Sequence, residues 1–275
     1  MPRAHNGSVE LEYEAFGSTD DPTLICLPGL GNQLLLFPVE FCESFVGRGF
    51  HVIRMDNRDA GLSSLTEPGD EYTLSDMAAD VIAVLDDAGV DDAVVLGVSL
   101  GGMIAQTTAI EHPARVRALV SIMSTTGEPD VGTPSREAMA ALVAEPAASI
   151  DEQIAQDLEA RAIWSNPEWF DPEQMAAYFR SCYERSWVPG GSGRQFDAVM
   201  RSGDRAAGLA ALTVPALVAH GEQDTLVHVS GGERTAELVP DAEFLLVDGM
   251  RHDFVYQAWP PIIEATTALT ARTFA

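Results

Sequence analysis

The sequence predicts an α/β protein with a mainly parallel, doubly wound sheet that carries an inserted helical cap. Short apolar runs alternate with helical patterns along most of the chain, and this alternation is typical of parallel strands joined by crossover helices. It stops between Thr125 and Leu212, where helical patterns follow one another without a strand. The length of 275 residues, 46% of them apolar, suits one large core with an insertion.

The predicted strands are short apolar runs bounded by turn residues. An Asn6-Gly7 turn is suited to a hairpin and precedes the first run, which alternates like a half-exposed strand. In chain order the strands are Val9–Phe16, followed by the runs expected to be buried: Leu24–Leu27, Phe50–Met55, Ala93–Val98, Val116–Met123, Pro215–His220 and Glu243–Val247. Helices are predicted between them at 38–48, 74–88, 101–112, 230–239 and 258–273.

This pattern divides the chain into a core at 1–124 and 213–275 and a helical cap at 125–212. Three of the four tryptophans lie in the cap, and together its aromatic residues predict an apolar lid over a ligand site. Any single one of them can equally serve to join the cap helices to each other. The candidate substrate contacts are Trp164, Trp169, Tyr178, Tyr183 and Trp187.

Composition and charge exclude several functional classes. All 16 basic residues are arginines, which removes chemistry that depends on a Schiff-base, P-loop or pyridoxal phosphate lysine. The formal net charge of −26 argues against nucleic acid and anionic membranes as partners, because both are bound through clustered cations. Residues 1–20 contain no apolar core of the length a signal peptide needs, and no segment is as long and apolar as a membrane span. We therefore expect a cytoplasmic protein, either a monomer or a homodimer.

The three cysteines give no sign of a metal site. Cys26, Cys42 and Cys182 lie far apart and lack metal-ligand spacing, which predicts buried free thiols and no bound metal.

A Gly-Val-Ser-Leu-Gly segment at 97–101 joins an apolar run to a helical pattern, which is the setting of a nucleophile elbow. Such an elbow holds its serine in a strained backbone conformation, so the residues two before and two after it must lack bulky side chains. Gly97 and Gly101 satisfy this requirement. Ser99 is therefore the candidate nucleophile.

Two further candidates directly follow strands, where the ligand site of an open α/β sheet lies. Asp224 follows the run at 215–220, and His252 follows the run at 243–247. A neutral imidazole can accept the serine proton, and a carboxylate on its other nitrogen fixes the tautomer. Asp248 and Asp253 compete with Asp224 for that second role, because both lie close to His252 in the sequence.

The Gly-rich segment Pro28–Asn32 follows the first buried run and is a candidate oxyanion loop. The N–H of Leu100, next to the candidate nucleophile, and the N–H of Leu30 would make a two-donor oxyanion hole. We interpret Arg58 and Asp59, within Asn57-Arg58-Asp59, as braces of the loop after a strand that satisfy backbone groups and each other.

Taken together, the segments Pro28–Gln33, Phe50–Ser64, 97–101 and Leu212–Leu217 resemble the aclacinomycin methylesterase-like branch of the serine esterases, within the α/β-hydrolase superfamily. The resemblance covers nearly all of the chain outside the cap. It implies an α/β-hydrolase fold, a triad of Ser99, Asp224 and His252, and no cofactor. The chain departs from many relatives at Pro28, where they have His, and at Arg251, where they have Gly.

These features predict a serine carboxylic-ester hydrolase that forms an acyl-enzyme and acts on an uncharged, hydrophobic or bulky small-molecule ester or lactone. A serine at the elbow excludes haloalkane dehalogenases and epoxide hydrolases, which use an aspartate there. Proline iminopeptidases, carbon–carbon bond hydrolases and cofactor-free perhydrolases keep a serine triad and stay open as alternatives. A non-catalytic small-molecule receptor with this fold is a further alternative.

Overall fold

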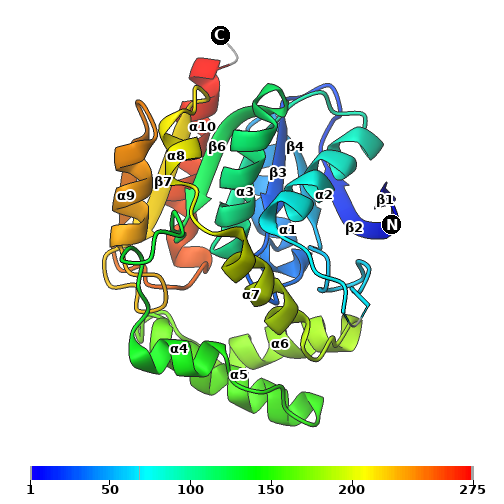
Figure 1. Ribbon diagram of the computed structural model, residues 1–275, viewed down its shortest axis with the longest axis vertical. Helices are drawn as coiled ribbons and strands as arrows, with labels where there is room; N and C mark the ends of the chain where they lie inside the picture. Colours follow the sequence, from blue (N-terminus) through cyan, green and yellow to red (C-terminus); the bar gives the residue numbers. More distant parts are fainter. Residues whose placement is uncertain (1, 68, 274–275) are drawn as a thin grey trace.

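The structure, a computed structural model, describes residues 2–67 and 69–273, and in these ranges eight strands form one sheet (Figure 1). Their order across the sheet is β1-β2-β4-β3-β5-β6-β7-β8. The first two pairings are antiparallel and all later ones are parallel. The strands are β1 (Arg3–Asn6), β2 (Val9–Phe16), β3 (Thr23–Leu27), β4 (His51–Met55), β5 (Ala93–Val98), β6 (Val116–Ile122), β7 (Ala216–Gly221) and β8 (Glu243–Val247).

Ten α-helices accompany the sheet in the described ranges. They are α1 (Val39–Val46), α2 (Leu74–Asp87), α3 (Leu100–Glu111), α4 (Arg136–Leu142), α5 (Ile150–Trp164), α6 (Pro172–Arg185), α7 (Gly191–Ser202), α8 (Ala206–Ala210), α9 (Ser230–Leu238) and α10 (Trp259–Thr273). Local sequence explains several of their starts: Thr73 and Asp76 form a capping box for α2, and the Asp171 side chain accepts two backbone N–H bonds at the start of α6.

Helices cover both faces of the sheet, as a doubly wound architecture requires. On one face α2, α3, α8 and α9 pack together, and on the other α1 packs against α10. Successive residues of the central strands point to opposite faces, so Val95 belongs to one buried apolar cluster and Leu96 to the other. The doubly wound fold, the predicted hairpin and the strand positions are all confirmed.

The last strand differs from the prediction. Glu243–Val247 was expected to be buried, but β8 lies at the edge of the sheet and buries only Val247 fully. Phe244 and Leu246 are exposed to 39% and 47%. The reason is that only one neighbour, β7, pairs with this strand, and an apolar run cannot show by itself that it lies at an edge.

Between β6 and β7 the chain, described throughout, forms helices and no strand. Figure 1 shows α4, α5 and α6 below the sheet, with α7 between them and the core. By contrast, α8 packs against α3 and α9 of the core. We use the word cap for α4 to α7, and the exact bounds 125–212 stay a prediction. None of the described helices is both long and apolar enough to cross a bilayer.

Candidate active site

Ser99 stands at a sharp turn between β5 and α3. Its φ of 56° and ψ of −115° are unusual for a residue with a side chain. The flanking glycines make this turn possible. A Cβ on Gly97 would lie 1.9 Å from the Gly101 carbonyl oxygen, and a Cβ on Gly101 would lie 2.0 Å from the carbonyl oxygen of Leu27. The strained turn is therefore held by backbone packing against the neighbouring strand.

The structure brings Ser99, His252 and Asp224 together from three separate loops. The Ser99 Oγ lies 3.0 Å from His252 Nε2, and the His252 Nδ1 lies 2.7 Å from Asp224 Oδ2. Because a carboxylate only accepts, Nδ1 carries the proton and Nε2 is free to accept the serine hydroxyl. Asp253, the nearer competitor in sequence, instead accepts hydrogen bonds from the N–H groups of Asn166 and Arg251.

The environment of Asp224 keeps it ionised. Burial acts to raise its pKa, but the charges and hydrogen bonds of His252 and His220 outweigh burial and hold the pKa well below its usual range. Its Oδ1 also accepts the N–H groups of Leu226 and Val227, each at 2.8 Å. A group with these partners is suited to stabilising an imidazolium beside it.

His220 is a feature of the site that the sequence analysis did not single out. Its ring is fully buried, its Nε2 donates to the Val227 carbonyl at 2.8 Å, and the same nitrogen lies 3.4 Å from Asp224 Oδ2. The packing is close, since a Cβ on Gly232 would lie 2.5 Å from His220 Nδ1. The one hint in the sequence is that His220 lies four residues before Asp224.

The loop after β3 lies against Ser99. A Cβ on Gly29 would lie 3.4 Å from the Ser99 Cβ, so this loop and the elbow face each other across the site. Within the loop the Asn32 N–H donates to the Gly29 carbonyl at 3.1 Å and closes a turn in which Gly31 has a φ of +68°. Leu100 is the first residue of α3, where backbone N–H groups lack helical partners. Leu30 lies within this turn and Leu100 directly follows Ser99, so their N–H groups stay the candidates for an oxyanion hole.

A cavity of about 190 Å³ lies between the cap and this loop. Four of the five cap aromatics named from the sequence line it: Trp164, Tyr178, Tyr183 and Trp187. Leu30, Gly31 and Asn32 line it as well, whereas Ser99 and His252 do not. The cavity is linked to the triad through Trp164, whose carbonyl accepts the His252 N–H at 3.0 Å.

Trp169 is the exception among those aromatics. It packs beside Gly249, whose added Cβ would meet the indole at 2.7 Å, and it belongs to an apolar cluster of the core. It does not line the cavity, because the short segment between α5 and α6 turns toward the loop that precedes His252. The sequence could not show which way this segment would turn.

The loop after β4 is a brace, as interpreted, but its charges do not pair with each other. Arg58 forms an ion pair with Asp80 at 2.6 Å, and Asp59 forms one with Arg194 of α7 at 2.7 Å. The expectation of a mutual pair was wrong because the two side chains point to different elements, one to α2 and one to the cap.

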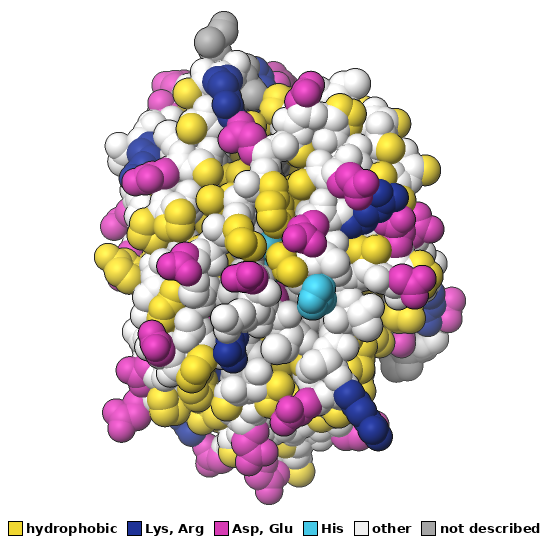
Figure 2. All heavy atoms as spheres, turned by 90° about the vertical axis from the view of Figure 1, so that its left-hand side faces the viewer, with side chains coloured by type: hydrophobic (Ala, Val, Ile, Leu, Met, Phe, Trp, Pro, Cys, Tyr) yellow, Lys and Arg dark blue, Asp and Glu magenta, His cyan; other side chains and the backbone are white. Residues whose placement is uncertain are grey.

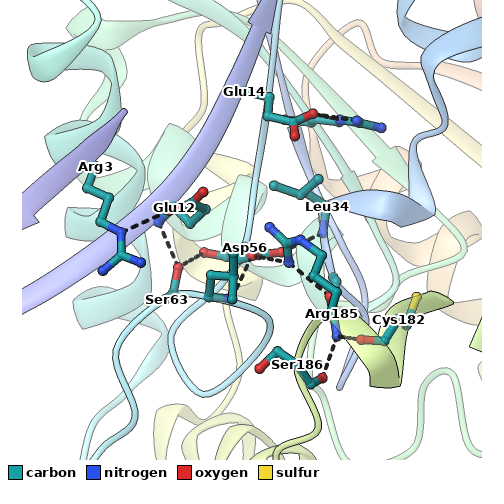
Figure 3. A network of polar contacts seen from close by, with 12 residues as sticks. Arg3, Glu12, Glu14, Leu34, Asp56, Ser63, Cys182, Arg185 and Ser186 are labelled. Atoms are coloured by element: carbon teal, nitrogen blue, oxygen red, sulfur yellow. Dashed lines mark hydrogen bonds and ion pairs between the residues drawn. The ribbon is translucent and has the colours of Figure 1, made fainter. Parts of the chain in front are cut away.

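A second set of polar contacts between cap and core lies at Asp56, shown at the centre of Figure 3. Its buried carboxylate accepts from Arg185 of α6 and from the Leu34 N–H, both at 2.7 Å. Burial raises its pKa, and these donors act in the opposite direction. The Gln33 side chain adds bonds to the carbonyls of Cys182 and Ser186. These contacts hold the C-terminal end of α6 onto the loop after β3.

Arg251, the cysteines and the acidic surface are the remaining features named from the sequence. The Arg251 guanidinium donates to the Ser165 carbonyl and to the Gln223 side chain, at 3.4 and 3.2 Å. All three cysteines are buried and free, as predicted. The face of the molecule that carries α9 shows acidic side chains spread among few arginines (Figure 2).

Known proteins resemble this chain over nearly its whole length. Rhodomycin D methylesterase DnrP from Streptomyces peucetius is 27% identical, with 96% of each chain covered. The 3-oxoadipate enol-lactonase 2 from Acinetobacter baylyi is 28% identical over 83% of this chain and 81% of its own. A methylesterase relative of this kind agrees with the resemblance stated from the sequence.

Solved structures and a family model agree with these relatives. A hydrolase from Pseudomonas aeruginosa superimposes with a TM-score of 0.72 at 26% identity, covering 97% of this chain and 95% of its own. Est816, described as an N-acyl homoserine lactone degrading enzyme, reaches 0.75 at 27% identity with full coverage of both chains. The model of the alpha/beta hydrolase fold matches residues 22–258, so the chain belongs to the α/β-hydrolase family.

Proposed function

We propose that this protein is a serine carboxylic-ester hydrolase that acts through an acyl-enzyme. Its relatives support the coarser conclusion that it is a hydrolase of esters or lactones. The observation that carries the serine mechanism is the continuous hydrogen-bonded chain from Ser99 through His252 to Asp224, with the serine in a strained backbone conformation.

The proposed reaction follows from this geometry. Ser99 Oγ attacks the ester carbonyl while His252 Nε2 takes its proton, and the N–H groups of Leu30 and Leu100 stabilise the oxyanion. His252 then protonates the leaving alkoxide oxygen, and the carbon–oxygen bond breaks to leave an acyl-enzyme on Ser99. Water, deprotonated by His252, attacks the acyl carbonyl, and the acid leaves as Ser99 recovers its proton. Asp224 stays ionised throughout and orients the imidazole.

The cap cavity favours an uncharged substrate with a hydrophobic or bulky part. Aromatic and aliphatic side chains, including Trp187, Phe179 and Leu142, share its wall with polar groups and with Asp157 and Arg161. The named relatives include both kinds of bond, because one is a methylesterase and others act on lactones. We therefore propose either a bulky methyl ester or a lactone as the substrate.

Hydrolysis of p-nitrophenyl esters from acetate to decanoate, by wild type and by Ser99→Ala, tests this proposal, with acid release followed on bulky methyl esters and lactones. We expect Ser99→Ala to lose on the order of 10⁶-fold in kcat, as other serine triads do. Labelling of Ser99 by a fluorophosphonate probe serves as an independent readout. Turnover that survives in Ser99→Ala would contradict the mechanism, and labelling without turnover on any ester would favour an iminopeptidase, a carbon–carbon bond hydrolase, a perhydrolase or a receptor.

A further inference from the structure

A buried glutamine of the cap reaches the loop that faces Ser99. Gln195 lies on α7, and its side chain is completely buried. Its Oε1 accepts the Gly31 N–H at 2.8 Å, and its Nε2 donates to the Arg58 carbonyl at 2.8 Å. One side chain therefore connects the cap to the loop after β3 and to the loop after β4.

The bond to Gly31 acts on the middle peptide of the turn at residues 29–32. The carbonyl of that peptide, on Leu30, accepts the Asn32 Nδ2 at 3.0 Å, while its N–H, on Gly31, is held by Gln195. Because a peptide group is planar, bonds at both of its ends define the orientation of the plane. Without the bond at the N–H end, the turn keeps its internal bonds but loses its direct hydrogen bond to α7.

The neighbouring peptides are restrained as well. The Asn57 side chain donates to the Pro28 carbonyl at 3.0 Å, and the Gly29 carbonyl accepts the Asn32 N–H. The Leu30 N–H belongs to the same peptide as that Gly29 carbonyl, and the two groups point in opposite directions. With the carbonyl directed into the turn, the N–H is directed out of it. The middle peptide, which Gln195 holds, is joined to this one through the Leu30 Cα, so Gln195 restrains the turn that carries the Leu30 N–H.

The start of α7 packs closely against the loops of the core. A Cβ on Gly191 would lie 2.1 Å from the Asp59 carbonyl oxygen, and a Cβ on Gly31 would lie 3.1 Å from the Ser192 Cβ. The ion pair between Arg194 and Asp59 holds the same turn of the helix. Gln195 is thus supported on both sides by contacts between cap and core.

We propose that Gln195 is a positioning residue for the oxyanion hole, which it orients through Gly31. The rate of the reaction then depends on whether α7 of the cap is packed against the loops after β3 and β4. This inference rests on the proposed function, since it assumes that the Leu30 N–H stabilises an oxyanion. Gln195 itself does not line the cavity. Its effect is on the transition state, in which charge develops on the carbonyl oxygen.

The first test is Gln195→Met, which keeps the length of the side chain and removes both hydrogen bonds. We expect kcat on p-nitrophenyl butyrate to fall by about 10- to 100-fold, less than the roughly 10²- to 10³-fold cost of deleting an oxyanion donor. KM should change by less than about threefold, and inhibition by a trifluoromethyl ketone should weaken by the same factor as kcat. The matched control is Gln106→Met, another fully buried glutamine, which bonds Ser121 and Arg205. It should lower Tm and leave kcat within about twofold.

The second test is Gln195→Glu, which separates positioning from packing. A protonated carboxyl has one acceptor and one donor, like the amide it replaces, whereas an ionised one cannot donate to the Arg58 carbonyl. The kcat of this variant, expressed as a ratio to wild type at each pH, should therefore rise as the pH falls from 8 to 6. A flat ratio, or a Gln195→Met kcat within twofold of wild type, would overturn the inference while leaving the serine mechanism intact. A wild type that hydrolyses no ester and takes no fluorophosphonate would overturn the proposed function and the inference together.

Discussion

The two walls of the site are held in different ways. On the core wall, Ser99, Asp224 and His252 follow β5, β7 and β8, and their positions are set by backbone packing and short-range bonds. On the cap wall, the loop after β3 and the cavity are held by side chains that bond across 129 to 164 positions of sequence, as with Arg185 and Gln195. The triad thus lies on the core wall, and the Leu30 loop and the cavity lie on a wall that a few polar contacts join to the cap.

This difference separates two kinds of substitution. At the core wall the sheet and the elbow pack backbone against backbone, so an added side-chain atom meets main-chain atoms that cannot move aside. A change at the cap wall removes individual hydrogen bonds or ion pairs, each worth on the order of 1 kcal/mol. Core variants should therefore lose activity or folding altogether, and cap variants should change rate and selectivity in smaller steps.

The largest expected effect is that of Asp224→Asn on the core wall. An amide in this place can hold the His252 ring in the wrong tautomer and cannot stabilise its charge, so we expect kcat to fall by on the order of 10⁴-fold. Steady-state kinetics on a p-nitrophenyl ester measures it. The control is Asp253→Asn. Asp253 lies beside His252 in sequence, but its carboxylate accepts the backbone N–H groups of Asn166 and Arg251. This control should cost less than tenfold, and a loss equal to that of Asp224→Asn would show that the acid has been misassigned.

The next effect is on the free energy of unfolding, and it compares a glycine-to-alanine change on the core wall with one in the cap. Gly101→Ala places a Cβ 2.0 Å from a backbone oxygen of β3, so we expect at least about 3 kcal/mol of lost unfolding free energy. Gly193→Ala in α7 meets no atom within 4 Å and should instead stabilise by up to about 1 kcal/mol. Urea denaturation measures both. A Gly101→Ala protein as stable as wild type would contradict the close packing of the elbow.

A smaller effect is expected from Trp187→Ala, which enlarges the cavity on the cap wall. We expect kcat/KM for the decanoate ester to fall by about tenfold, roughly 1.4 kcal/mol of lost apolar contact, with the acetate ester within about twofold. Tyr256→Ala is the control, because this aromatic side chain is 71% exposed and does not line the cavity. Equal losses of kcat/KM on the acetate and the decanoate esters would show that the cavity does not bind the acyl chain.

The smallest effect concerns the ion pair between Asp59 and Arg194. Burial acts to raise the pKa of Asp59, but the hydrogen bonds from Arg194 and Thr66 outweigh it and lower the pKa. A lowered carboxyl pKa stabilises the fold above the unfolded value of about 3.9, and this contribution is lost as the pH falls further through the folded pKa.

Arg194→Met should therefore cost about 1 kcal/mol at pH 7, a modest value because the arginine is one-third exposed, and less below about pH 4. Urea denaturation at both pH values checks this. Arg201→Met removes the same charge from the more exposed pair with Glu71 and should cost close to nothing at either pH. A cost for Arg194→Met that does not change with pH would point to lost packing instead of lost charge.

Much of the core wall could be predicted from the sequence because its signals are local. The elbow shows itself through Gly97 and Gly101, and the positions of Asp224 and His252 directly after strands identify them as candidates. The structure places all three groups within hydrogen-bonding distance. His220 and Gln195 escaped detection because nothing near them in sequence distinguishes a buried polar side chain with partners from an ordinary surface one.

By itself the sequence determined the fold class, the strands and the residues at the strand ends, because hydrophobic periodicity and glycine spacing report local backbone geometry. Only the tertiary structure decided that β8 lies at an edge, that Trp169 faces the core and that Arg58 and Asp59 take different partners. It also decided that Gln195 reaches Gly31. Each of these depends on which elements become neighbours in space, and the partners involved are separated by tens to more than a hundred residues of sequence.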